Sequence, residues 1–382
     1  MMSDDFKSQH FQDENLSEES ELTKEHAEIS ELSKKGYILL KENRINESES
    51  NFMKILTLDP ENNYALVGLG DAARKRGVYR EAADFYKKCL IYHPGNNYAL
   101  FGLADCYKAL NQYQKAIEIW EQYLLHDNRN ITVLTRIADA YRKVRDFRKS
   151  KAVYLRVLEM DTDNPYALIG LGHLHYDFKE YKEALHFWQR MVDVQGETVD
   201  IRVLTSIGNC YRKLKQFDAG IPYFEKSLEK EPGNFYALFG LADCYRGMGD
   251  AINSLKYWNH ILKKDPKNKV ILTRAGDAFR AMERYDEALE YYERALNIEF
   301  DVYAVLGMAN ISRHQGKMEA AIESLLRLVQ NDGKNYRLYL ELAQCYLALG
   351  EKRKAEEVLH EFTKLGIRNP HIIDLLTKIQ NQ

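Results

Sequence analysis

The ten residues Tyr98–Tyr107 recur with the same sequence at Tyr236–Tyr245, and this repetition constrains the fold more than any other feature. Weaker copies begin at Tyr64, Tyr166 and Tyr303, and a second version begins at Val133, Val203 and Ile271. The period is 34 residues with slips of one or two, and ten repeats begin near residues 29, 63, 97, 131, 165, 201, 235, 269, 302 and 336. Such repeats bury a core only by stacking on one another. The 382 residues therefore predict one array, although length alone suggests two or three globular domains.

Each repeat has the pattern of two amphipathic helices joined by a turn. Apolar residues at positions 4, 7, 8 and 11, and again at 20, 24 and 27, follow the helical spacing. Position 8 is always Gly or Ala and position 20 is always small, whereas position 24 is large, as in Phe52, Tyr86 and Trp120. Small residues let two helix backbones approach, and the large residue fills the space beside them. Turn residues near position 15 or 16 and prolines that end the second helix are Gly77, Asn111, Asp146, Gly249, Pro60, Pro94, Pro232 and Pro266.

This pattern resembles the tetratricopeptide repeat (TPR) family, which has a bulky residue, Leu, Gly or Ala, Tyr, Ala, an aromatic residue, Ala and Pro at fixed places over 34 residues. The resemblance covers ten repeats, residues 29–368, and departs from the family at the terminal Pro of four repeats. It implies an all-α fold, a right-handed superhelix of helix-turn-helix repeats. Residues 369–382 have the pattern of an amphipathic helix that caps the last repeat. Residues 1–28 are acidic and nearly free of aromatic residues, so we expect a disordered tail.

Charge and hydropathy exclude several classes of protein. The net charge of −3 divides into −8 for residues 1–31 and +5 for the rest, and neither value matches a nucleic-acid binder. No apolar run is long enough to span a membrane, and the first residues have no secretory signal pattern. We therefore expect neither nucleic-acid binding nor direct membrane insertion.

The residue types that often carry chemistry lie at packing positions. Cys106, Cys210, Cys244 and Cys345 fall at position 10 of their repeats and Cys89 falls at position 27, without the spacing of a metal or disulfide site. Buried thiols of this kind favour a cytoplasmic location. The sequence contains no phosphate-binding loop, hydrolase motif or zinc motif. We expect no catalytic activity, no cofactor and no bound metal.

In a TPR array, by resemblance, positions 2, 5, 9, 12 and 13 of the first helices line the inner, concave face. Position 12 is basic in seven of eight consecutive repeats, position 9 is Asp, Asn or His, and positions 2 and 5 often carry large aromatic or apolar residues. The predicted partner-binding residues are Arg74, Lys108, Arg142, Arg212, Arg246, Arg280 and Arg313 at position 12, Asp105, Asp139, Asn209, Asp243 and Asp277 at position 9, and Tyr98, Phe101, Tyr166, Tyr236 and Phe239 at positions 2 and 5.

These ordered stripes have two interpretations. Arginine binds carboxylates and carbonyls, and exposed aromatic residues provide large contact areas, which favours a groove for an extended or helical peptide. Alternatively, Asp at position 9 and Arg at position 12 pair within one helix or across repeats and hold the array together. The clamp with which some TPR proteins bind chaperone tails is excluded, because position 5 is never Lys in the central eight repeats and position 6 is mostly Gly.

The function expected from these patterns is protein–protein interaction, as a scaffold or adaptor that binds a protein or peptide in the groove. The alternative is a regulatory peptide sensor whose superhelix changes shape when a ligand binds. A third possibility, an enzyme subunit, is opposed by the lack of residues outside the array. The acidic segment 1–28 is a further candidate occupant of the groove, because its charge is opposite to that of the basic stripe. The sequence predicts neither the identity of the partner nor an oligomeric state.

Overall fold

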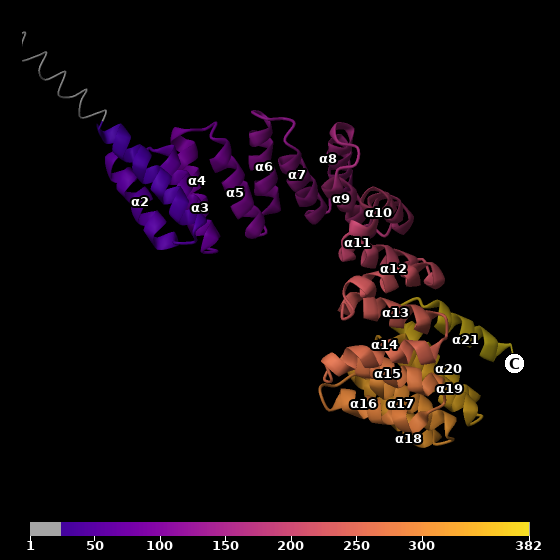
Figure 1. The fold of residues 1–382 in the computed structure, drawn as a ribbon. Coiled ribbons are helices and arrows are strands. Elements are labelled where there is room, and N and C mark those ends of the chain that lie inside the picture. Colours follow the sequence, from indigo (N-terminus) through magenta and orange to yellow (C-terminus); the bar gives the residue numbers. More distant parts are fainter. Residues whose placement is uncertain (1–23, 382) are drawn as a thin grey trace, which may run out of the picture. The chain divides into compact units, whose positions relative to one another are not determined.

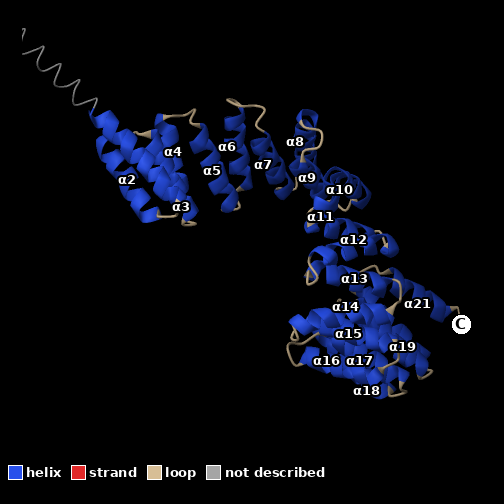
Figure 2. Cartoon of the chain, viewed as in Figure 1, coloured by secondary structure: helices blue, strands red, loops and turns tan. Residues whose placement is uncertain are grey.

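The computed structural model describes residues 24–381, and every regular element in this range is helical (Figures 1 and 2). Residues 24–41 form a helix that precedes α2. The helices of the N-terminal half are α2 (Ile45–Leu58), α3 (Asn63–Lys75), α4 (Tyr79–Tyr92), α5 (Asn97–Ala109), α6 (Tyr113–Leu124), α7 (Ile131–Lys143), α8 (Phe147–Met160), α9 (Pro165–Asp177) and α10 (Tyr181–Gln195). The predicted all-α class is confirmed.

The C-terminal half begins with a short 3₁₀ helix, η1 (Gly196–Thr198). Its α-helices are α11 (Ile201–Lys213), α12 (Phe217–Lys230), α13 (Phe235–Gly247), α14 (Ala251–Lys264), α15 (Lys269–Ala281), α16 (Tyr285–Leu296), α17 (Val302–His314), α18 (Met318–Asn331), α19 (Tyr336–Ala348), α20 (Lys352–Lys364) and α21 (Pro370–Gln380). The chain divides into two compact bodies, Met1–Val194 and Gln195–Gln382, which we call the N-terminal and C-terminal halves. Within each half, the repeats are hairpins of a first and a second helix, and helices that follow one another along the chain pack together.

The first helix of nearly every repeat begins at an asparagine. The side chains of Asn62, Asn96, Asn130 and Asn164 each accept a hydrogen bond from a backbone N–H in the first turn of the helix that follows. Asn234 and Asn268 do the same in the C-terminal half, where Asp200 and Asp301 replace asparagine before α11 and α17. Because these donors have no partner within the helix, the caps fix where each repeat begins.

The turn inside each hairpin places one residue in the left-handed region. Gly77 and Gly249 have φ of 79° and 81°, values that glycine adopts without a steric penalty, and Asn111 has φ of 58°. Asp146 lies in the turn between α7 and α8, as predicted. The residue with positive φ is Arg145, at 66°, and Asp146 instead caps α8 by accepting a hydrogen bond from the Lys149 N–H.

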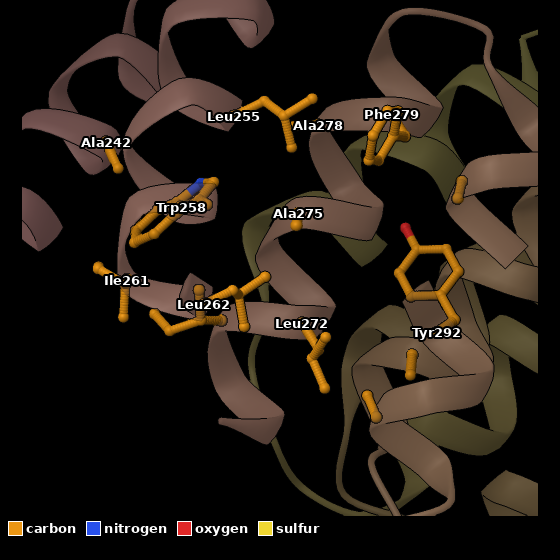
Figure 3. Packing of buried hydrophobic residues seen from close by; sticks show 14 of the residues in the cluster. Ala242, Leu255, Trp258, Ile261, Leu262, Leu272, Ala275, Ala278, Phe279 and Tyr292 are labelled. Atoms are coloured by element: carbon orange, nitrogen blue, oxygen red, sulfur yellow. The ribbon is translucent and has the colours of Figure 1, made fainter. Parts of the chain in front are cut away.

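The core of each hairpin is organised around the large residue at position 24, as predicted. The Tyr86 ring lies against two first helices, since a Cβ at Gly70 or at Gly102 would lie 2.6 Å or 2.4 Å from it. Gly70 is at position 8 of the same repeat and Gly102 is at position 6 of the next one. Figure 3 shows the corresponding packing in the C-terminal half, where Trp258 and Tyr292 lie among apolar side chains of α13–α16. Only glycine leaves room for a ring between two helices at this distance.

The residue at position 24 is related to two features that alternate between successive repeats, namely the residue at position 6 and the contact between neighbouring first helices. After Tyr86, Tyr154, Phe224 and Tyr292, position 6 of the next repeat is Gly, and the first helices α3 and α5, α7 and α9, α11 and α13, and α15 and α17 contact each other. After Trp120 and Trp258, position 6 is Arg136 and Arg274, and the described pairs α5–α7 and α13–α15 do not approach as closely. The larger indole fills the space between two first helices that lie farther apart, so position 6 of the next helix can carry a side chain instead of glycine.

The ends of the array show where the predicted boundaries apply. Ile372, Leu376 and Ile379 of α21 are buried against the last repeat, which is the packing expected of a capping helix. Residues 24–28, which were predicted to belong to the acidic tail, are already helical. The rest of that tail, residues 1–23, lies outside the described residues. None of the helices in residues 24–381 is long and apolar enough to cross a membrane.

Candidate partner-binding face

The surface that carries positions 2, 5, 9 and 12 of the first helices is hollowed in both halves, and we call it the first-helix face. In the N-terminal half, Arg74, Tyr98 and Phe101 line a hollow of about 460 Å³. A second hollow there, of about 550 Å³, is lined by Lys108, Asp139, Arg142 and Tyr166. In the C-terminal half, Arg246, Asp277 and Arg280 line a hollow of about 330 Å³. Ten of the predicted residues thus border a hollow, while the other seven lie on α5, α11, α13 and α17.

The tyrosines at position 2 are the most exposed aromatic side chains of this face. Tyr98 is 80% exposed, Tyr166 is 72% exposed and Tyr236 is 68% exposed. Tyr64 and Tyr303, which occupy the same position in other repeats, are also exposed. A tyrosine left in water at this level contributes little to the core, so the fold does not explain its presence.

The phenylalanines at position 5 are partly committed to the fold. Phe101 packs edge-on against Tyr123, with 6.3 Å between ring centroids, and the Arg136 guanidinium lies 4.8 Å from the Phe101 ring centroid. Phe239 packs edge-on against Trp258, with centroids 5.1 Å apart. Both phenylalanines therefore form the floor of the face, and the tyrosines stand above it.

In the N-terminal half the arginines join neighbouring repeats. Arg74 lies 3.0 Å from an Asp71 oxygen on its own helix and 3.1 Å from an Asp105 oxygen on the next first helix. Arg142 contacts Asp177 of the next first helix at 2.6 Å and Asp139 of its own helix at 3.4 Å. Charge-assisted bonds of this kind, partly shielded from water, hold successive first helices in register.

The C-terminal half contains the same arrangement in its first repeats. Asp243 accepts hydrogen bonds from Arg212 of the preceding first helix at 2.5 Å and from Arg246 of its own helix at 2.6 Å. Arg212 also donates to the Asn209 side chain at 3.2 Å, and Arg280 donates to the Asn310 side chain at 3.2 Å. The internal pairing that was the alternative to partner contacts is therefore present along this stripe. Lys108, by contrast, has no ion-pair partner within the described part of the chain.

The tyrosines at position 24 make a bond that the sequence patterns did not predict. The hydroxyls of Tyr86, Tyr154 and Tyr292 donate to Asp71, Asp139 and Asp277 at 2.8, 2.7 and 2.9 Å. Burial and the neighbouring carboxylate both raise the pKa of each tyrosine, so the hydroxyls stay protonated and donate. A signal was available, because each repeat with Tyr at position 24 has Asp at position 9.

Two equivalent aspartates differ in acidity. Burial raises the pKa of Asp105, and the charges of Arg136 and Arg74 offset this only in part. Burial acts on Asp243 as well, but its hydrogen bonds and charge interactions with Arg246 and Arg212 outweigh burial and lower its pKa. The number and closeness of the arginine donors thus decide the direction of the shift.

The cysteines take part in packing, as their repeat positions predicted. All five cysteines are free and buried. Burial raises the pKa of Cys106 and Cys345 to about 11, so these thiols are protonated and unreactive near neutral pH. Residues 24–381 contain no group of three or more His, Cys, Asp or Glu side chains placed to hold a metal ion.

Comparison with known proteins identifies the repeat. Three models described as tetratricopeptide repeat match residues 33–96, 73–138, 135–195, 201–234, 273–336 and 312–379. A search of curated protein sequences finds no significant match.

Solved structures of repeat proteins resemble the chain in fold. The MamA protein is 24% identical, covers 45% of this chain and 93% of its own, and has a TM-score of 0.41. YrrB, described as a TPR protein with an unusual peptide-binding site, is 20% identical, covers 49% of this chain and 95% of its own, and has a TM-score of 0.44. Yeast Tom70 is 13% identical, covers 93% of this chain and 96% of its own, and has a TM-score of 0.46.

Proposed function

The chain belongs to the tetratricopeptide repeat family, whose repeats support protein interaction, and from this premise we propose that it binds an extended segment of a partner protein along its first-helix face. In this proposal the chain acts as an adaptor or scaffold and has no catalytic step. Its five free, buried cysteines favour a cytoplasmic site of action. The peptide-sensing alternative stays a prediction.

The observation that carries this proposal is the contrast between the tyrosines and the arginines of one face. Arg74, Arg142 and Arg212 are paired with carboxylates of neighbouring repeats, whereas Tyr98 and Tyr166 stand exposed beside hollows. Tyrosine offers a large amphipathic surface and loses little conformational entropy when it is covered. We therefore assign the anchoring of the partner to the tyrosines, and the spacing of the repeats to most of the arginines.

A library of random dodecapeptides displayed on phage and panned on the full chain tests the proposal. We expect peptides to be recovered on the wild-type chain and recovery to be lost on Tyr98→Ser/Tyr166→Ser/Tyr236→Ser/Tyr303→Ser, which removes four exposed tyrosines of position 2. Each tyrosine is expected to contribute about 1–2 kcal/mol, or roughly a tenfold change in affinity. The matched control is Leu125→Ser/Ile252→Ser, which removes apolar side chains that are 83% and 71% exposed outside the first-helix face. Equal recovery on both variants would show that the tyrosines are not the anchors.

A further inference from the structure

The two halves carry a different balance of charge on their first helices. Leaving histidine aside, α3, α5, α7 and α9 carry six cationic and four anionic side chains. The helices α11, α13, α15, α17 and α19 carry nine cationic and three anionic side chains. The first helices of the C-terminal half therefore carry more cationic side chains than their own carboxylates neutralise, and Asp200 and Glu299 outside these helices pair with only two of them.

The distances between arginine nitrogens and carboxylate oxygens also differ between the two halves. In the N-terminal half Arg74, Arg136 and Arg142 each have a carboxylate oxygen within 3.1 Å. In the third repeat of the C-terminal half, Arg274 and Arg280 lie 3.7 Å from Asp277. These two distances exceed that of a normal hydrogen bond. Arg280 donates instead to Asn310 and to the Tyr292 hydroxyl, whereas Arg274 keeps donors available for a ligand.

Arg337 is the arginine of this face without a carboxylate partner. Within residues 24–381 no carboxylate oxygen lies within ion-pair distance of its guanidinium, which instead lies 5.7 Å from the ring centroid of Tyr303 and 6.0 Å from that of Tyr336. The aromatic rings and a hydrogen bond with the Tyr336 side chain hold the guanidinium in place, and its remaining N–H donors can bind a carboxylate.

These arginines converge on one hollow. Arg246, Arg274, Arg280 and Arg337 line the hollow of about 330 Å³, together with the acidic residues Asp277 and Glu341. Both carboxylates are shared, because Asp277 also accepts from the Tyr292 hydroxyl and Glu341 lies 3.5 Å from Arg313. The lining has two more cationic than anionic side chains, and because Arg246 is already paired with Asp243, we expect Arg274 and Arg337 to attract a further carboxylate.

An apolar hollow adjoins the basic one. It has a volume of about 490 Å³, and it shares Arg274 and Tyr303 with the basic hollow. Val270, Phe300 and Val302 form its apolar lining, and Lys269, Asp301 and Asp332 lie at the same hollow. Val270, Phe300 and Tyr303 are exposed. The shared wall places a site for a carboxylate beside a site for an apolar side chain.

We propose that these two hollows bind an acidic segment of a partner protein in which Asp or Glu stands next to a large apolar residue. This inference rests on the proposed function and adds the chemical class of the bound segment. The carboxylate takes N–H donors of Arg274 and Arg337, and the apolar side chain lies against Tyr303. The N-terminal half offers no equivalent pair of arginine donors, since the arginines of its first helices already have close carboxylate partners.

The same panning experiment tests this inference. Peptides recovered on the full wild-type chain are expected to be enriched in Asp and Glu next to Leu, Ile or Phe. One such synthetic peptide is expected to bind Arg274→Glu/Arg337→Glu at least tenfold more weakly than the wild-type chain. Arg274→Gln/Arg337→Gln, which removes the charges without reversing them, is expected to lose less affinity. Binding to the wild-type chain is expected to weaken as the salt concentration is raised. The matched control is Lys263→Glu/Lys267→Glu, which reverses two exposed charges of the same half outside the first-helix face and is expected to change affinity less than about twofold. Circular dichroism confirms that each variant is folded.

The failures of the two proposals are distinguishable. Peptides that lack acidic enrichment, or that bind Arg274→Glu/Arg337→Glu unchanged, would overturn the acidic site and leave tyrosine-mediated binding intact. Recovery of no peptide would overturn the proposed function itself. A synthetic peptide of residues 1–23, with net charge −6, serves as competitor. If it binds as tightly as the selected peptides, the occupant is the chain's own acidic segment and the assignment to a partner is overturned.

Discussion

Helices α5 and α13 contain the same ten residues, yet the aspartate in each is held by different arginines. Asp105 of α5 pairs with Arg74 and Arg136, which both belong to neighbouring repeats. Asp243 of α13 pairs with Arg212 of the preceding repeat and with Arg246 of its own helix. The difference arises outside the shared ten residues, because position 12 is Lys108 in α5 and Arg246 in α13.

The comparison shows that the apolar and the polar positions of a repeat depend differently on their surroundings. The apolar positions act alike in both copies, since each motif packs its helix against a tryptophan at position 24. The polar positions act through their neighbours, and the pKa of Asp105 is raised while that of Asp243 is lowered. Identical sequences thus share a fold but not an electrostatic environment.

The largest expected effect tests the shared part of the comparison. Trp120→Ala and Trp258→Ala each remove a fully buried indole, and each is expected to lower the free energy of unfolding by about 3–5 kcal/mol. Chemical denaturation followed by circular dichroism measures both. Because the packing is the same, the two costs are expected to agree; a difference above about 2 kcal/mol would contradict equivalent cores.

Substituting the glycine at position 6 is expected to have a smaller effect on stability, and one that differs between the two repeats. A Cβ would lie 2.4 Å from the Tyr86 ring in Gly102→Ala and 2.3 Å from the Phe224 ring in Gly240→Ala. Overpacking lowers the free energy of unfolding by about 1–3 kcal/mol, and the higher helix propensity of Ala offsets about 1 kcal/mol of this loss. We expect Gly102→Ala to cost more in thermal unfolding, since a shift of Tyr86 also strains its bond to Asp71. The reverse order would show that this bond adjusts without cost.

The aspartates are expected to differ in stability and in pH dependence. Asp243→Asn weakens two short bonds to arginine and is expected to cost about 1–3 kcal/mol at neutral pH, more than Asp105→Asn. Asp243 has a lowered folded-state pKa, so its contribution is present above the unfolded pKa of about 3.9 and is lost as pH falls through the folded value. Asp105 has a raised pKa, so its contribution is present below about pH 3.9 and is lost as pH rises through the folded value.

These signs give a direct experiment. As the solution is acidified from pH 7, the cost of Asp243→Asn is expected to shrink and the cost of Asp105→Asn to grow, both followed by denaturant unfolding. Parallel pH profiles for the two variants would contradict the assignment of different environments.

The smallest expected effect comes from making the two repeats more alike. Lys108→Arg places at position 12 of α5 the residue that pairs with Asp243 in α13, and it is expected to stabilise the chain by about 0.3–0.5 kcal/mol. The pKa of Asp105, followed by NMR, is expected to fall. Lys143→Arg, at an exposed position of α7, is the control and is expected to leave that pKa unchanged.

The fold followed from the sequence because apolar spacing and residue size are local properties. The alternation of small and large residues at positions 8, 20 and 24 predicted the hairpins, and the rings of Tyr86 and Trp258 lie where it placed them. Asp146 lies in the predicted turn, but residue type alone did not show that it caps α8 while its neighbour Arg145 takes the positive φ, because Asp suits both places.

The face was harder to predict than the fold. Whether an arginine pairs within the array or stays available depends on how closely its guanidinium approaches a carboxylate, on its own helix or on the next first helix. Arg142 lies 2.6 Å from Asp177 of the next first helix, whereas Arg274 lies 3.7 Å from Asp277 of its own helix. The sequence shows residue type at each position but not these distances. Exposure of Tyr98 and Tyr166 was predictable from position 2, because no other part of the repeat covers it.

The central claim is that tyrosines of the first-helix face bind a partner while its tightly paired arginines hold the repeats together. The most direct test measures thermal unfolding and peptide affinity for Tyr98→Ala/Tyr166→Ala/Tyr236→Ala/Tyr303→Ala and for Arg74→Ala/Arg142→Ala/Arg212→Ala, with one peptide selected on the wild-type chain. The account predicts that the tyrosine variant keeps its unfolding midpoint and loses binding. The arginine variant is predicted to unfold at lower temperature and, while folded, to keep its affinity within a few-fold. An arginine variant that melts like the wild type but no longer binds would contradict the account.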